Sequence, residues 1–328
     1  MGTTECGLRK WLLRASKEIE IFMEAAILHL DTWSLAWRGF WTKLAPPCGH
    51  SDCMHTQSVW GRLRGKTGGV VIQGVRYCRN ECLERALSDA VRRIRQATPR
   101  PAAAHRVPLG LLLLSRQQLT VEQLRAALDA QRVAGRGKIG EWLVHPGFAS
   151  EQQVTAALAR QWSCPVLRST SWNLAPSRVP QIPVSLLESF VMIPVDYVET
   201  TATLHIAFGE GIDYSVLYAI EQMLGCHTES CMAVPSFVRR NLHALSGHRG
   251  ESEVVFDRVA DAAEFSRIIS SYCIRLAASE IHLAACGPFV WVRLLRPSRP
   301  PLDLLLRSPR DVFRPAFSPS AVPELSAV

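Results

Sequence analysis

The sequence lacks three features that would assign it to a common class. No uncharged apolar run reaches the roughly 18 to 20 residues that a membrane-spanning helix needs. The N-terminal apolar stretch is interrupted by Glu18, Glu20 and Glu24, unlike a signal peptide. A complete phosphate-binding loop is also missing, because GRLRGKTGG at 61–69 has Trp60 where the first glycine of G-x-x-x-x-G-K-[ST] belongs. We therefore expect neither a helical membrane protein nor a P-loop enzyme.

The composition is that of a folded, basic protein. With 328 residues, 48% of them hydrophobic, the chain can form two or three modest domains with buried cores. A net charge of +8 permits contact with nucleic acid, anionic lipid or an acidic protein surface. Ten cysteines without an export signal indicate a reducing compartment and favour metal binding over disulfides. We expect a cytoplasmic protein.

The two ends of the chain differ from its middle. We assign residues 1–45 to a helical segment in which Trp33, Trp37 and Trp41 recur on one face. That face packs against the rest of the protein, docks on a partner, or lies at a membrane interface, and the sequence leaves these alternatives open. Residues 99–107 are expected to form a linker and 297–328 a disordered Pro-rich tail.

Two cysteine pairs in residues 46–98 predict a zinc module. Cys48 and Cys53 form the first pair, and Cys78 and Cys82 the second. Four thiolates suit tetrahedral Zn²⁺ and leave no open position for a substrate, so the ion would be structural. GVVIQGVRY between the pairs indicates a β-hairpin, and a helix follows from about residue 81 to 97. This order resembles treble-clef modules of the TRASH/MYM type.

The ligand set of this module stays open at this stage. His50 and His55 lie beside the first pair and are alternative ligands to one of its cysteines.

Two segments of the chain repeat one pattern at a spacing of 30 residues. The first is LGLLLLSRQQLTVEQLRAALDAQ at 109–131 and the second is IGEWLVHPGFASEQQVTAALARQ at 139–161. Each has an apolar residue followed by Gly, a polar helix start at Thr120 or Ser150, apolar residues four apart and a closing Gln. Each copy is expected to form a helix, a turn and a second helix.

This tandem over 108–165 resembles the N-terminal (MshEN-type) domain of the GspE/PilB/MshE assembly ATPases of type II secretion and type IV pili. The resemblance implies that the two copies together bind one cyclic di-GMP. The implied ligand residues are Arg106, Leu109, Gly110 and Gln131 in or before the first copy, and Lys138, Ile139, Gly140, Gly147 and Gln161 in the second. Two positions depart from the family pattern: Pro108 stands where an arginine belongs, and Gln117 replaces the inner glycine.

The resemblance continues after the tandem and ends before the ATPase core. It implies a small α/β unit over 166–248, with a strand at 204–208 and a helix at 236–245. ASEIH at 278–282 then resembles the start of the family's next domain, so we assign 264–296 to a remnant of it. Ser279, Glu280 and His282 are read as a helix-to-strand corner and not as a catalytic cluster. The predicted fold class is a multidomain α+β protein with a zinc module.

The function expected from these features is that of a non-enzymatic accessory or regulatory protein. Its implied partners are the inner-membrane platform or the assembly ATPase of a secretion or pilus system, with peripheral contact to the membrane surface and regulation by cyclic di-GMP. One alternative is a truncated motor ATPase that lacks its catalytic half. Another is a zinc-containing nucleic-acid-binding protein, for which the arginines of 85–106 are the sole argument.

Overall fold

The computed structural model describes residues 48–53, 69–97, 106–168, 181–246 and 252–307. The tryptophan-rich segment, nearly all of GRLRGKTGG and most of the expected linker lie outside these ranges. The described residues fall into two compact units. The first contains 48–53, 69 and 74–79, and the second contains 70–73 and everything described from 80 onward.

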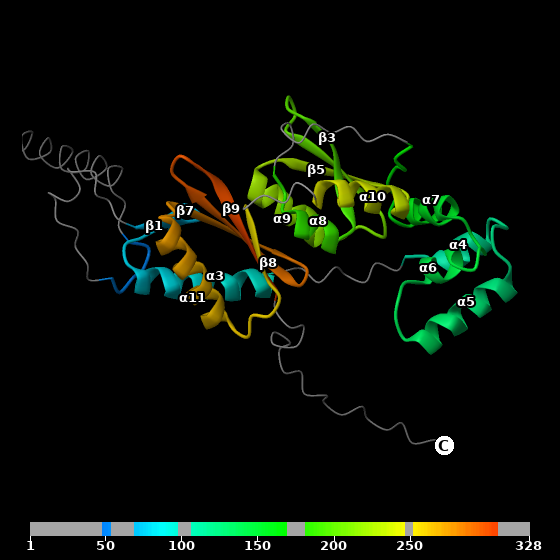
Figure 1. Cartoon of the computed structure of the whole chain (residues 1–328), viewed down its shortest axis with the longest axis horizontal. Coiled ribbons are helices and arrows are strands. Elements are labelled where there is room, and N and C mark those ends of the chain that lie inside the picture. Colours follow the sequence, from blue (N-terminus) through cyan, green and yellow to red (C-terminus); the bar gives the residue numbers. More distant parts are fainter. Residues whose placement is uncertain (1–47, 54–68, 98–105, 169–180, 247–251, 308–328) are drawn as a thin grey trace, which may run out of the picture. The chain divides into compact units, whose positions relative to one another are not determined.

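The described chain begins with two strands, continues with a run of helices from α3 to α8, and then mixes strands and helices up to the strands β7, β8 and β9 (Figure 1). The helices are α3 (Asn80–Ala97), α4 (Leu109–Leu114), α5 (Val121–Ala134), α6 (Ile139–Val144), α7 (Glu151–Gln161), α8 (Val184–Ser189), α9 (Tyr214–Leu224), α10 (Pro235–Ser246) and α11 (Ala262–Leu276). The strands are β1 (Val70–Ile72), β2 (Val75–Tyr77), β3 (Met192–Val198), β4 (Thr203–Phe208), β5 (His227–Met232), β6 (Glu253–Phe256), β7 (Glu280–Cys286), β8 (Phe289–Arg296) and β9 (Arg299–Arg307). None of the helices in the described ranges is long and apolar enough to cross a membrane.

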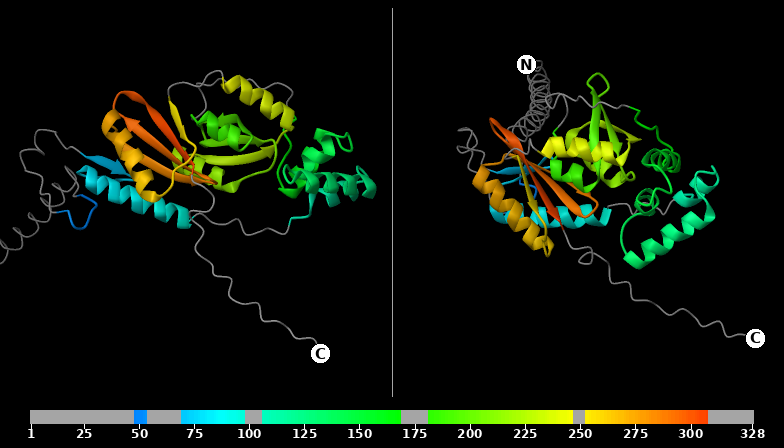
Figure 2. Two further views of the ribbon diagram at one scale, coloured as in Figure 1. Left: turned by 60° about the horizontal axis from the view of Figure 1, so that its bottom comes forward. Right: turned by 45° about the vertical axis from the view of Figure 1, so that its right-hand side comes forward.

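The larger sheet of the second unit has the strand order β1-β7-β8-β9-β6. β7, β8 and β9 pair antiparallel, whereas β1 pairs parallel with β7 and β6 parallel with β9. Helices α3 and α11 pack together beside this sheet, as Figures 1 and 2 show. Trp291 and Leu305 instead join the core shared with α9. Because both faces are covered, the first six residues of β8 are all buried.

This sheet changes the predicted domain boundaries. We expected 46–98 to be a module of its own and 264–296 to be a remnant of another domain. In the structure, Val71 of β1 is in register with Glu280 of β7, and α3 packs against α11. β1 and α3 of the first segment therefore form one layered structure with β7 and α11 of the second.

The predicted disordered tail is wrong for its first part. Residues 299–307 form β9, which lies between β8 and β6 in the sheet. The two prolines at 300–301 stand at the start of the strand, where a missing N–H is tolerated. The leucines at 302 and 304–306 are buried, so the hydrophobic effect favours an ordered strand here. Residues 308–328 lie outside the described ranges.

The smaller sheet has the order β3-β4-β5 and is packed by α8, α9 and α10. β3 and β4 are antiparallel, and β4 and β5 are parallel. The strand expected at 204–208 and the helix expected at 236–245 are both present, each with one additional residue at its N-terminal end and, for α10, one at its C-terminal end. Ile206, Phe208 and Ile220 are fully buried in the core.

The two tandem copies have the same local structure. Thr120 and Ser150 cap α5 and α7, each in a capping box with the glutamine three residues later. α4 packs on α7 and α5 packs on α6, so each short helix contacts the long helix of the other copy. Leu113 and Leu143, which are equivalent in the repeat, are fully buried between them. The α+β class predicted from the sequence is confirmed.

Candidate ligand cavity and cysteine cluster

The closing glutamine of each tandem copy bonds to the start of the other copy. Gln131 Nε2 donates to the carbonyl oxygen of Gly137 at 2.9 Å, and Gln161 Nε2 donates to that of Val107 at 2.7 Å. Val107 and Gly137 are equivalent in the 30-residue repeat. The two copies are thus joined reciprocally, which explains why both end in glutamine.

The repeated glycines allow close packing within each copy. A Cβ on Gly110 would lie 2.7 Å from Leu124 Cδ1, and a Cβ on Gly140 would lie 3.2 Å from Val154 Cγ1. Leu124 and Val154 are also equivalent in the repeat. These glycines let the short helix of each copy approach its own long helix.

A cavity of about 820 Å³ lies where the second copy meets the β3-β4-β5 part of the unit. Its wall is formed by α6, α7, the turn after β4 and the start of α10. The volume lies within the range of small-molecule sites. Five residues that the resemblance implied line it, namely Leu109, Lys138, Ile139, Gly140 and Gln161.

The other four implied residues lie outside the cavity wall. Gln131 bonds to Gly137 as described above, Gly110 is buried against Leu124, and Gly147 has a positive φ of 78° in the turn between α6 and α7. Arg106 stacks over the ring of Trp162, which itself lines the cavity, with 3.4 Å between its Cζ and the ring centroid. The cavity therefore belongs mainly to the second copy.

Three residues of the cavity wall form two linked ion pairs. Glu210 Oε2 lies 2.9 Å from Lys138 Nζ, and Glu210 Oε1 lies 2.7 Å from Arg239 Nη2. We call this arrangement the Glu210 bridge. Burial raises the pKa of Glu210, but the hydrogen bonds and charges of Lys138 and Arg239 outweigh burial and lower the pKa below its ordinary value. The carboxylate is thus the stable form, and it pairs with both cations while leaving one net positive charge in the group.

A second polar contact involves Glu151 of the cavity wall. Ser236 Oγ, at the start of α10, donates to Glu151 Oε2 at 2.6 Å at the start of α7. The tandem is therefore tied to α10 at two places by charged or polar groups.

Trp162 presents a hydrogen-bond donor without an acceptor. Its buried indole N–H has no partner among the described residues, although most buried polar groups are paired. The guanidinium of Arg106 lies over the Trp162 ring, and the ring centroids of Trp162 and Tyr214 are 5.9 Å apart. The indole is held by these neighbours at the wall of the cavity.

Sequence reasoning missed Trp162, Glu210 and Arg239 as site residues. Trp162 directly follows the closing Gln161, so its position in the repeat was the available signal. Glu210 lies 72 residues from Lys138 and 29 from Arg239, and no local pattern links them.

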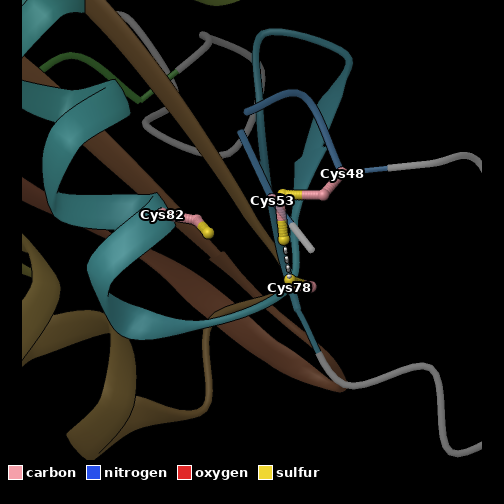
Figure 3. Close-up of side chains that lie close together, drawn as sticks. All are labelled: Cys48, Cys53, Cys78 and Cys82. Atoms are coloured by element: carbon pink, nitrogen blue, oxygen red, sulfur yellow. Dashed lines mark hydrogen bonds between the residues drawn. The ribbon is translucent and has the colours of Figure 1, made fainter. Parts of the chain in front are cut away.

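The four predicted cysteine ligands lie together (Figure 3). The ligand atoms of Cys48, Cys53, Cys78 and Cys82 all lie within 4.8 Å of one another, and Cys53 Sγ lies 3.4 Å from Cys78 Sγ. A tetrahedral zinc with Zn–S bonds of about 2.3 Å places its sulfurs about 3.8 Å apart. The donor set therefore fits a structural zinc ion.

Local backbone contacts position the first cysteine pair. Gly49 N–H donates to the carbonyl oxygen of Arg76 at 2.8 Å, and Cys53 N–H donates to that of His50 at 3.1 Å. His50 is not part of the cysteine group, and its Nδ1 accepts the backbone N–H of Asp52. His55 lies outside the described ranges.

The cluster makes its thiols unequal. Burial raises the pKa of Cys48, but backbone hydrogen bonds at His50 and Cys78 outweigh it and lower that pKa to about 7. Burial and the neighbouring Cys53 and Cys48 raise the pKa of Cys78 to about 12. Crowded thiols oppose each other's ionisation, and a cation among them would remove that opposition. None of the cysteines in the described ranges is in a disulfide.

The fold and these two sites describe an α+β protein with a cavity beside a helical tandem and a separate metal-type cysteine cluster. No family model matches the chain, and a search of curated proteins finds no match.

Solved structures match about two fifths of the chain. A structure of MshE with cdg has 27% identity and a TM-score of 0.37, and the match covers 42% of this chain and 99% of that one. A structure of the N-terminal domain of XpsE has 18% identity and a TM-score of 0.33, and the match covers 41% of this chain and 91% of that one. A second crystal form of XpsE has a TM-score of 0.27. MshE is a member of the family that the tandem resembles.

Proposed function

We propose that this chain is a non-enzymatic regulatory component of a type II secretion or type IV pilus-like system. It binds cyclic di-GMP in the cavity beside the second tandem copy and docks on the inner-membrane platform or the assembly ATPase. It acts on the cytoplasmic side of that membrane.

The observation that carries the proposal is the coincidence of the cavity with the second tandem copy. The resemblance of the tandem to the MshEN-type domain implied a ligand site from sequence alone, and five of its nine implied residues line one cavity. The second copy also keeps a basic residue, Lys138, at the position where the first copy has Pro108.

The chemistry of the wall suits a ligand that has both anionic and donor groups. Lys138 and Arg239 supply cations for phosphate oxygens. Glu141 and Asp213 also line the cavity, and carboxylate oxygens accept hydrogen bonds from the N–H groups of a guanine edge.

The cysteine cluster would hold zinc as a structural ion. Cys48, Cys53, Cys78 and Cys82 supply four sulfur ligands, which closes the coordination shell against a substrate. When bound, zinc would hold the four thiolates together and supply folding free energy there.

Native mass spectrometry of the full chain tests both ligands in one measurement. We expect one zinc per chain, and one cyclic di-GMP after the nucleotide is added. Cys82→Ser should remove the zinc and leave the nucleotide, whereas Cys164→Ser, at a half-buried thiol outside the cluster, should keep both. A spectrum with zinc but no nucleotide at saturating concentration would refute the ligand assignment.

To test docking, binding of the full chain is measured to a purified platform protein and to a purified assembly ATPase from the organism that encodes this chain. Saturable binding supports the proposed role, and its absence for both candidates counts against it.

A further inference from the structure

The Glu210 bridge places a carboxylate of the protein on the two cations that face the cavity. Lys138 directly precedes α6, Arg239 lies on α10, and Glu210 follows β4. Three segments far apart in the sequence thus meet at one carboxyl group. The Glu210 side chain is 19% exposed, whereas those of Lys138 and Arg239 are 63% and 55% exposed.

We propose that Glu210 is an internal competitor of the ligand: an anionic group that enters the cavity must displace the Glu210 carboxylate from Lys138 and Arg239. This inference rests on the proposed function, because it describes how binding at the same cavity is regulated.

The geometry gives the competition its physical basis. Each oxygen of the Glu210 carboxylate serves one cation, so the carboxylate resembles one phosphate with two accepting oxygens. A ligand phosphate that takes both cations leaves a half-buried carboxylate without either partner, and this cost is subtracted from the binding free energy. Glu210 thereby weakens binding and sets the ligand concentration at which the cavity fills.

Two other carboxylates at the wall, those of Glu151 and Asp213, are bonded to other groups. Glu151 accepts the hydroxyl proton of Ser236, and Asp213 caps α9 by accepting from Ser215. Both are therefore engaged by neutral donors at helix starts, whereas Glu210 is the carboxylate between the two cations.

Displacement of Glu210 would also change how the tandem is held. The bridge joins the start of α6 to α10, and the contact between Glu151 and Ser236 joins α7 to α10. A ligand that takes over Lys138 and Arg239 would replace the first of these links with its own phosphate. Arg239 on α10 would then contact the ligand in place of Glu210.

Titration calorimetry of the wild-type chain and of Glu210→Gln tests the inference. Glutamine keeps the size of the side chain and removes its charge, so we expect E210Q to bind cyclic di-GMP about tenfold more tightly than the wild type. Glu229→Gln is the matched control, because Glu229 pairs with His205 away from the cavity wall and its loss changes the net charge equally. E229Q should bind like the wild type. Equal or weaker binding by a folded E210Q would overturn the inference.

A second variant covers the case in which E210Q does not fold. Glu210→Asp keeps the charge but is one methylene too short to reach both cations, so it should also bind more tightly than the wild type. Equal or weaker binding by this variant would overturn the inference too.

Titration with inorganic pyrophosphate distinguishes a wrong ligand assignment from a wrong assignment of Glu210 as the competitor. If no variant binds cyclic di-GMP but E210Q binds pyrophosphate more tightly than the wild type does, the nucleotide assignment is wrong and the competitor role stands. If neither anion binds any variant, the competitor role is refuted as well.

Discussion

A single carboxylate, that of Glu210, pairs with two cations at the cavity. Its pKa is lowered because Lys138 and Arg239 favour the charged form more than burial disfavours it. A depressed carboxyl pKa contributes stability that is complete above the unfolded-state pKa and is lost as the pH falls through the folded-state pKa. The Glu210 bridge therefore stabilises the protein at neutral pH.

The lowered pKa of Glu210 predicts how stability depends on pH. Between pH 7 and a pH below the ordinary glutamate value of 4.5, the wild type should lose more stability than E210Q, because the variant has no Glu210 proton to take up. Urea unfolding midpoints of both proteins at the two pH values measure the difference. Parallel losses in the two proteins would show that the bridge contributes nothing to the pH dependence.

A second residue-scale feature is the buried pair on β8 and β9. Asp303 accepts from Arg293 through both carboxylate oxygens at 2.8 Å, and from the indole N–H of Trp291 at 2.8 Å. Arg293 also donates to the carbonyl oxygen of Gln181. The charged groups are desolvated but fully bonded, so removal of one partner leaves a buried charge.

Asp303→Asn should destabilise the protein by about 3 kcal/mol, since Arg293 would stay buried opposite a neutral amide. Asp129→Asn is the control, because Asp129 pairs with Arg132 in the open, where ion pairs contribute little. Denaturant unfolding of both variants measures the costs. A cost for Asp303→Asn no larger than that of the control would contradict a desolvated pair.

At the scale of elements, the two long tandem helices depend on their first residues. Thr120 and Ser150 accept the backbone N–H of the residue three positions on, and the glutamine side chains bond back. Thr120→Ala and Ser150→Ala should each cost about 1 kcal/mol. Thr120→Asn and Ser150→Asp keep a capping oxygen and should cost much less. Thermal unfolding of the four variants distinguishes a lost cap from a general effect of substitution.

These elements were predictable because their determinants are local. Thr120 and Ser150 precede apolar residues at helical spacing, so sequence alone places the starts of α5 and α7 correctly. The strand β9 was missed because Pro300 and Pro301 suggested disorder, whereas burial of the leucines after them decides the structure. In β9, burial of the leucines therefore outweighs the local preference of the two prolines for irregular structure.

At the scale of the whole molecule, the determinants are contacts between distant segments. β1 pairs with β7, some two hundred residues later, and α3 packs on α11. No spacing rule connects such segments, so the sequence placed β1 and α3 in one module and β7 and α11 in another, whereas in the structure these four elements pack together. The grouping of the four cysteines was predictable because the two members of each pair lie close in the sequence. The Glu210 bridge, in contrast, joins residues that only the fold brings together.

The central claim is that one cyclic di-GMP binds per chain at the cavity beside the second tandem copy. Isothermal titration of the full chain with cyclic di-GMP tests it most directly, with Lys138→Met as the site variant and Arg132→Met, at an exposed arginine of the first copy, as the control. We predict saturable binding of one nucleotide per chain that is lost or at least tenfold weaker in K138M and unchanged in R132M. An absence of saturable binding by the folded wild-type chain, or equal affinity in K138M, would contradict the account.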